Sequence, residues 1–382
     1  MGMVDFNYVI VNVLMLIVFI YAGKKVSESE KPWQYIWLCT VAFAFVLGSR
    51  YLRGNDYIRY QETFLFDYDA SEVVFTAFNR LLRSVGVTEY TFLYVYSIPF
   101  ILCGLYFCKR YARLSLFLYP AFLMAFIFFD EYCIRQALGF SFVFLYMGVL
   151  FDDGEEDKTK REKVKRLALL VFFAIMSFSV HTVNMLNVLF ITAIYLVFAS
   201  KTIPFFLSVP SFVFSAVVLS NAIDWSYLEN GLLFLGGVNE KFLIYTERTN
   251  QFFSSDAFND EYTRSFFGKI FECIGHCSLF YLGYRTIKEI QPSKSIISLY
   301  NVYVLGSIID RCFWNYELLR RVFDPMLAFW CFVIAFVMTN AKKVEYKFFE
   351  KWLFLGLLYF PYELGYKYLV ERGRMTLFLW DM

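Results

Sequence analysis

The chain has 382 residues, of which 59% are hydrophobic, 22% are aromatic and only 18% are charged. Soluble domains carry about 25% charged residues, so this composition excludes a soluble domain of the ordinary kind. The net charge of +2 says little about partners, and no nucleic-acid partner is expected.

Apolar stretches of about 20 residues recur along the chain, and each is long enough to cross a bilayer as a helix. They predict an all-α polytopic membrane protein with about twelve transmembrane helices. The whole chain, 1–382, is expected to form a single integral membrane domain. The first apolar run lacks the flanks of a cleaved signal peptide and is expected to remain as a span. The predicted spans cover residues 6–23, 33–49, 90–107, 114–129, 133–151, 166–181, 183–200, 203–220, 265–285, 295–311, 321–340 and 348–365.

Lysine and arginine in short loops predict the orientation, because cytoplasmic loops carry more of them. Basic residues are concentrated in the loop after the first span and in alternate loops thereafter, which places the N-terminus outside. A loop at 221–264 then lies on the outer side. Residues 72–87 have apolar residues at helical spacing but include arginines, so they predict an amphipathic helix lying at the membrane interface.

The first polar motif on the outer side is SRYLRGNDYIRYQETF, at 49–64. Arg50 and Arg53 share a face if the preceding helix continues, and Asp56 could hold an arginine or act as a base. These side chains could bind an anionic substrate. The alternative is that they anchor the helix end to lipid headgroups, and Arg59 is assigned to that role.

The second motif is DEYCIRQALGF, at 130–140, where Arg135 and Gln136 stand in the first turn of a span. A helix N-terminus favours anions through its free N–H groups and its dipole. An arginine there predicts a phosphate or carboxylate site. The alternative is that Arg135 pairs with Asp130 or Glu131.

Histidine is rare in the chain, and His181, within MSFSVHTVNML, lies at the outer end of a span. An imidazole titrates near neutral pH and can accept a proton, although a lone histidine is often structural. The other histidine, His276, is assigned a structural role. Its neighbours Cys273 and Cys277 do not complete a metal site with it, because a fourth ligand is missing.

The last polar motif is IIDRCFWNYELLRRVFDP, at 308–325, with Arg311, Arg320 and Arg321. An arginine within a span costs about 2.5–3.5 kcal/mol on insertion scales, so it is usually functional or paired. Pairing with Asp310 or Asp324 could explain some of these arginines.

Several familiar catalytic motifs are missing from the sequence. It has no phosphate-binding G-x-x-x-x-G-K-[ST] loop, no G-x-G-x-x-G and no G-x-S-x-G elbow, so ATP-driven chemistry is not indicated. Asp67 and Asp69 could bind a divalent metal, as such pairs do in some sugar transferases, but a solvated loop is favoured. No cofactor and no metal are predicted.

Four pieces, taken in order, resemble the EpsG/Wzy group of polysaccharide polymerases. They are RYLRGNDYIRY (50–60), IRQAL (134–138), SVHT (179–182) and Arg321 before an aromatic and apolar run. The members of this group are bacterial inner-membrane proteins that polymerise lipid-linked oligosaccharide repeats. The resemblance implies a GT-C-like membrane glycosyltransferase architecture with its active site facing the periplasm. One departure is Asn55, where the group often has threonine.

The resemblance also implies a substrate, an oligosaccharide repeat linked to undecaprenyl pyrophosphate. The growing chain would move from its lipid carrier onto the free end of a new repeat. Arginine binds pyrophosphate in a planar, bidentate way, so Arg50, Arg53, Arg135 and Arg321 are expected to bind it. The further substrate contacts expected are Gln136, Tyr60, Arg311, Arg320 and Trp225.

The base and the stereochemistry stay open at the level of sequence. His181 or Asp56 could deprotonate the acceptor hydroxyl in an inverting displacement, whereas Glu131 as a nucleophile would give retention. Trp225 and the other aromatic residues of the outer loop could stack on sugars or form a packed cap. The expected partners are the lipid bilayer and, within the same pathway, a chain-length regulator and a flippase.

Three other functions compete with polymerisation: a flippase or transporter for lipid-linked sugars, an O-antigen ligase-like glycosyltransferase, and a non-catalytic scaffold of the export machinery. A transporter needs ionisable groups near the bilayer midplane, reachable from both sides. Here these groups are predicted at one outer face, which favours an enzyme.

Overall fold

The structure is a computed structural model, and in the part that it describes the regular secondary structure is helical apart from one pair of two-residue strands. The described residues are 6–28, 31–51, 57–67, 73–152, 159–222, 266–314, 317–363, 365 and 377–379. The elements before residue 152 are α1 (Phe6–Glu28), α2 (Trp33–Gly48), β1 (Arg50–Tyr51), α3 (Tyr57–Phe66), α4 (Val73–Ser84), α5 (Phe92–Cys108), η1 (Lys109–Leu114), α6 (Ser115–Tyr132) and α7 (Ile134–Leu150). The later ones are α8 (Lys160–Val180), α9 (Asn184–Phe198), α10 (Phe205–Phe214), η2 (Ser215–Leu219), α11 (Ser220–Ala222), α15 (Phe266–Ile290), α16 (Lys294–Cys312), α17 (Glu317–Leu327), α18 (Trp330–Asn340), α19 (Phe348–Gly356), α20 (Tyr359–Glu363) and β2 (Leu377–Phe378).

Each predicted span coincides with one of these helices or with consecutive helices. Within the described residues, three helical stretches are long and apolar enough to cross a membrane: Phe6–Glu28, Phe92–Tyr132 and Arg320–Asn340. The second stretch comprises α5, η1 and α6 and bends at Tyr111, where φ is −109° and ψ is 40°. Several shorter apolar helices accompany them. These helices indicate an all-α membrane protein, whereas the number of spans and the GT-C-like architecture stay predictions.

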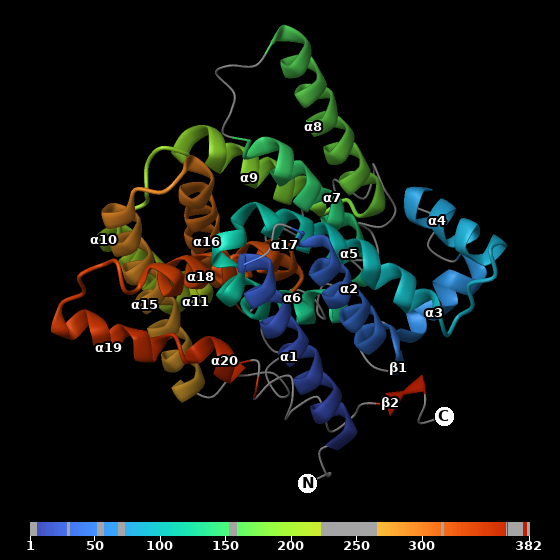
Figure 1. The fold of residues 1–382 in the computed structure, drawn as a ribbon, viewed down its shortest axis with the longest axis horizontal. Helices are drawn as coiled ribbons and strands as arrows, with labels where there is room; N and C mark the ends of the chain where they lie inside the picture. Colours follow the sequence, from blue (N-terminus) through green and yellow to red (C-terminus); the bar gives the residue numbers. More distant parts are fainter. Residues whose placement is uncertain are drawn as a thin grey trace.

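The core lies where the helices from the two halves of the chain meet. α2 packs against α5, α1 against α6 and α5 against α7, while α18 packs against α6. Phenylalanine rings fill this contact, including Phe100, Phe126 and Phe144, whose centroids lie 5.5–6.0 Å apart. Such ring pairs favour edge-to-face and tilted geometries. α8 projects beyond the other helices, and α3 and α4 lie together at one side (Figure 1).

Helix α4 covers most of the amphipathic segment predicted at 72–87. Its buried side chains, Phe75, Thr76, Asn79 and Leu82, recur at helical spacing, and Asn79 accepts a hydrogen bond from Tyr96. Its position at the membrane interface stays a prediction. Of the predicted outer loop 221–264, only residues 221 and 222 are described, at the end of α11, and the rest lies outside the described residues.

A close approach of α2 to α5 depends on Gly48, because a Cβ there would lie 2.5 Å from the Tyr94 ring and 2.7 Å from its Cα. Overpacking of this kind typically costs about 1–3 kcal/mol, so we expect Gly48→Ala to lower the thermal unfolding midpoint in detergent. Gly148, in α7, is the matched control, because a Cβ there meets nothing within 4 Å. Gly148→Ala should leave the midpoint unchanged or raise it, since alanine is the better helix former. Equal midpoints for the two variants would contradict the packing described.

Candidate functional site

Arg50 lies in β1, just after α2, and is held in place by contacts of its own backbone and of its neighbour Ser49. The Ser49 hydroxyl lies 2.7 Å from the Tyr94 hydroxyl, and the Ser49 carbonyl accepts a 2.8 Å hydrogen bond from Leu379. Arg50 itself pairs with Phe378 in the antiparallel β1–β2 ladder. Its side chain is 1% exposed. The C-terminal strand therefore fixes the residue on which the first polar motif depends.

An acidic pair lies close to Arg50, where α6 ends. Asp130 and Glu131 are buried in the last turn of α6, and the helix breaks at Cys133, where φ is −116° and ψ is 50°. The Ser97 hydroxyl donates a 3.1 Å hydrogen bond to Asp130, which is also within electrostatic reach of Arg50. A buried carboxylate is stable only with such partners. The break at Cys133 turns the chain directly into α7.

Arg135 lies against two aromatic rings in the first turn of α7. Its guanidinium carbon is 5.5 Å from the centre of the Tyr60 ring, on α3, and 5.8 Å from that of the Phe75 ring, on α4. Cation–π attraction to these rings stabilises the guanidinium. Its N–H donors lie in the plane of the guanidinium. The contacts with α3 and α4 therefore orient Arg135 at the N-terminus of α7, where anions are favoured.

Gln136 joins the start of α7 to two other parts of the chain. Its side-chain amide donates a 3.0 Å hydrogen bond to the Arg321 carbonyl, and its own carbonyl accepts a 3.0 Å bond from the Asn184 side chain. Asn184 is the first residue of α9, and its backbone N–H donates a hydrogen bond to the carbonyl of His181, the residue that directly follows α8. The structure thus brings Arg135, Gln136, His181 and the Arg321 backbone to one region.

Other sequence-predicted residues cannot be placed. Arg53, Asp56 and Trp225 lie outside the described residues. Their predicted roles in binding pyrophosphate, deprotonating the acceptor and contacting sugar stay predictions. Tyr57, just after this gap, is described, and burial raises its pKa to about 12 although Arg50 lowers it. Tyr57 therefore keeps its proton at neutral pH and does not serve as a base.

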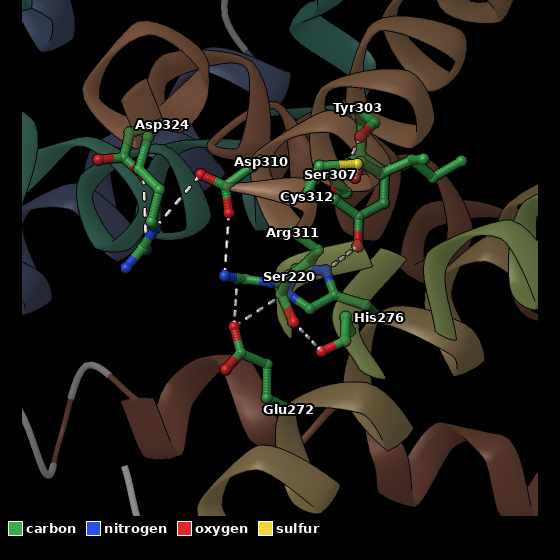
Figure 2. Close-up of polar contacts among 12 residues, drawn as sticks. Ser220, Glu272, His276, Tyr303, Ser307, Asp310, Arg311, Cys312 and Asp324 are labelled. Carbon is green, nitrogen blue, oxygen red and sulfur yellow. Dashed lines mark hydrogen bonds and ion pairs between the residues drawn. The ribbon is translucent and has the colours of Figure 1, made fainter. Parts of the chain in front are cut away.

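A second group of charges is buried between α15, α16 and α17, and Figure 2 shows it. Arg311 lies between two carboxylates: one guanidinium nitrogen pairs with Asp310 at 2.9 Å and another with Glu272. All three side chains are at most 1% exposed. The imidazole of His276 lies 4.0 Å from the same Glu272 oxygen and 2.7 Å, through its other nitrogen, from the Tyr303 hydroxyl. His276 therefore belongs to a buried polar network.

Arg320 extends this network onto α17. Its guanidinium lies 3.5 Å from Asp310 and 3.6 Å from Asp324, so it shares one carboxylate with Arg311. The Arg311 guanidinium also lies 4.7 Å from the centre of the Trp314 ring. Arg311 and Arg320 were both expected to contact substrate. The structure shows that protein carboxylates pair with both of them.

Sequence reasoning missed several of these polar residues. Glu272 could have been found, because an ionisable residue inside a predicted span is a functional candidate by default. Asn184 lies within the His181 motif, three residues after the histidine, but was given no role there. Ser97 carries no such signal, since a single serine in an apolar run is common. Its role depends on the folded proximity of α5 and α6.

Asp67, weighed above as a metal ligand, instead pairs with two arginines of α4. Arg80 and Arg83 each lie 2.9 Å from the same carboxylate oxygen of Asp67. Arg83 also donates hydrogen bonds to the carbonyls of Phe64 and Leu65. Partial burial alone raises the pKa of Asp67, but the hydrogen bonds and charges of Arg83 and Arg80 outweigh it and hold the pKa below its usual value. Asp67 thus ties α3 to α4, the two helices that orient Arg135.

This tether predicts a pH effect. A carboxyl whose pKa is lower in the folded protein adds stability above its unfolded pKa, about 4, and loses it as the pH falls through the folded value. We expect Asp67→Asn, which tolerates the positive φ of 55°, to speed hydrogen exchange in α4 at pH 7. The free energy of the local unfolding that exposes the α4 amides to exchange should fall by about 1 kcal/mol. The difference from wild type should shrink when the same peptides are compared below pH 4, and a difference that persists there would contradict the assignment.

A family model described as the EpsG family matches residues 34–372, which include both polar clusters. The chain belongs to the EpsG family. No curated protein and no solved structure matches it. The family is one of polysaccharide polymerases of the glycosyltransferase type, so membership confirms the resemblance seen in the sequence motifs and indicates polysaccharide polymerase activity.

Proposed function

We propose that the chain polymerises oligosaccharide repeats linked to undecaprenyl pyrophosphate, by glycosyl transfer on the periplasmic face of the bacterial inner membrane. The proposal rests on the contacts at the start of α7 in a chain of the EpsG family. There Arg135 lies against Tyr60 and Phe75, and Gln136 joins the Arg321 backbone to Asn184. Several parts of the chain therefore meet at a helix N-terminus suited to an anion.

The proposed reaction uses the lipid pyrophosphate as the leaving group. An acceptor hydroxyl oxygen attacks the anomeric carbon of the donor, the bond from that carbon to pyrophosphate breaks, and undecaprenyl pyrophosphate leaves. Negative charge develops on the pyrophosphate, so fixed positive charge stabilises the transition state. Arg50, Arg53, Arg135 and Arg321 are the residues proposed to supply it. Protonation by a carboxylic acid, which glycosidases need, is less important here because pyrophosphate already leaves readily.

The hydroxyl proton goes to a base, for which we propose His181. It ends α8, and its carbonyl is bonded to Asn184, whose side chain contacts the first turn of α7. Its imidazole can accept a proton near neutral pH. A single displacement with this base inverts the anomeric centre. If the product linkage instead retains the donor configuration, Glu131, buried at the end of α6, becomes the nucleophile.

The test starts from a strain that lacks the gene. Its lipid-linked repeats, extracted and mixed with the purified protein in detergent, should yield a ladder of products without ATP or nucleotide sugar. On a gel, the strain's own surface polysaccharide should collapse from a ladder to single-repeat bands. Complete loss of chains in the strain would instead indicate a ligase or a flippase, and translocation of the lipid-linked repeat without chain growth would establish the flippase.

A further inference from the structure

Helix α17 connects the buried charges of α15 and α16 to the proposed site. Arg320 pairs with Asp310 of α16, while the next residue, Arg321, accepts a hydrogen bond from Gln136 of α7 through its carbonyl. α17 therefore contacts the charge network through the Arg320 side chain and the first turn of α7 through the backbone of Arg321.

The contact between α16 and α17 is both close and ionic. A Cβ on Gly306 would lie 2.5 Å from the Cβ of Met326, so the two helices approach closely there. Near the end of α16, Asp310 receives Arg311 at 2.9 Å and Arg320 at 3.5 Å. Arg311 in turn pairs with Glu272 of α15 (Figure 2). Because Glu272, Asp310 and Arg311 are buried, the attraction between them is weakly screened and sensitive to geometry.

We infer that Glu272, Arg311, Asp310 and Arg320 form a positioning relay. The relay fixes α17, and through the bond between Gln136 and Arg321 it sets the relation of α17 to the start of α7. None of the four residues then needs to contact substrate. This inference rests on the proposed function for its catalytic consequence, but its structural part, the coupling of α16 to α7 through α17, stands by itself.

Arg320→Gln is the variant that tests the relay. Arg320 is 28% exposed, so removing its charge disturbs folding less than a change at the buried Arg311. We expect kcat on the extracted lipid-linked repeats to fall about 10- to 100-fold with KM within about twofold, because a misplacement of about 1 Å costs as much. Arg320→Lys, which keeps the charge, should restore most of the rate.

Arg285→Gln is the matched control. Arg285 is 33% exposed and pairs with Glu289 at 2.9 Å and Glu350 at 3.6 Å, so the substitution breaks comparable ion pairs at the other end of α15. Its kcat should stay within about twofold of wild type. The double variant Asp310→Asn with Arg320→Gln should lose less activity than the product of the two single losses, because both changes remove the contact between Asp310 and Arg320. Asp310→Asn also removes the pair with Arg311, so the double variant should be at least as impaired as Arg320→Gln.

Hydrogen exchange supplies a measurement that does not depend on activity. Arg320→Gln should speed exchange in peptides from α17 and in those from the first turn of α7, whereas Arg285→Gln should do neither. Faster exchange in α17 alone would overturn the relay, because α7 would then not be coupled to it. A raised KM with an unchanged kcat would also overturn it, by making Arg320 a substrate contact. If the wild-type protein makes no ladder, the proposed function fails, and the exchange measurement alone decides the coupling.

Discussion

Replacing Arg135 with alanine is expected to abolish the product ladder while the protein still folds. Arg135 stands in the first turn of α7 against the rings of Tyr60 and Phe75, so its charge is fixed where the proposed leaving group gathers negative charge. Loss of one preorganised donor of this kind costs about 10²–10³-fold in kcat. The rate is measured on extracted lipid-linked repeats, and folding is checked by the thermal unfolding midpoint in the same detergent.

Two further variants sharpen the result. Arg135→Lys keeps the positive charge but loses the planar, bidentate geometry, so it should fall between wild type and alanine. Arg110, in η1, gives a matched control, because it donates hydrogen bonds to the carbonyls of Gly148 and Phe151 at the opposite end of α7. Arg110→Ala should keep its rate per folded molecule within about threefold of wild type. A full ladder from Arg135→Ala would reject the pyrophosphate site at α7.

Much of the fold could be predicted from the sequence, because helices that cross a membrane correspond to long apolar runs. Every predicted span coincides with helical structure. The pairing of β1 with β2 could not be predicted, since Arg50 and Phe378 lie at opposite ends of the chain and a two-residue strand carries no periodic pattern. The sequence predicted a break between the spans at 90–107 and 114–129, and the structure has a kink between them at Tyr111, where the backbone leaves helical geometry.

The candidate site was predictable where a polar motif interrupts an apolar run. The motif around Arg135 and Gln136 was located in this way, and the structure places it in contact with α3, α4, α9 and α17. The carboxylate partners of Arg320 could be recognised only in the fold. The sequence favoured Arg321 for substrate, and the structure pairs the Arg320 side chain with Asp310 and Asp324. Partners far apart in sequence, such as Glu272 for Arg311, need the folded contact to be recognised.

Replacing Arg311 with leucine is expected to cost far more stability than replacing a partly exposed arginine. The change leaves Glu272 and Asp310 buried without the guanidinium that lies between them. Breaking a buried pair from one side typically costs about 3–5 kcal/mol, because an uncompensated charge remains. Arg285→Leu breaks a partly exposed pair with Glu289 and a 3.6 Å contact with the buried Glu350. Glu350 keeps the Tyr281 hydroxyl and the Lys347 backbone N–H as donors, so the change should cost only about 1 kcal/mol. Thermal and denaturant unfolding in detergent measure both.

The double variant Arg311→Leu with Glu272→Leu decides what the buried pair contributes. It removes one charge of each sign, so the desolvation penalty of both disappears, and most of the lost stability should return. Asp310 keeps Arg320 as a partner at 3.5 Å. A double variant as unstable as Arg311→Leu alone would contradict the pairing with Glu272. A stable double variant with lowered kcat and unchanged KM is the expected result, because Arg311 would then act on the reaction through the position of α17 and not through contact with the sugar.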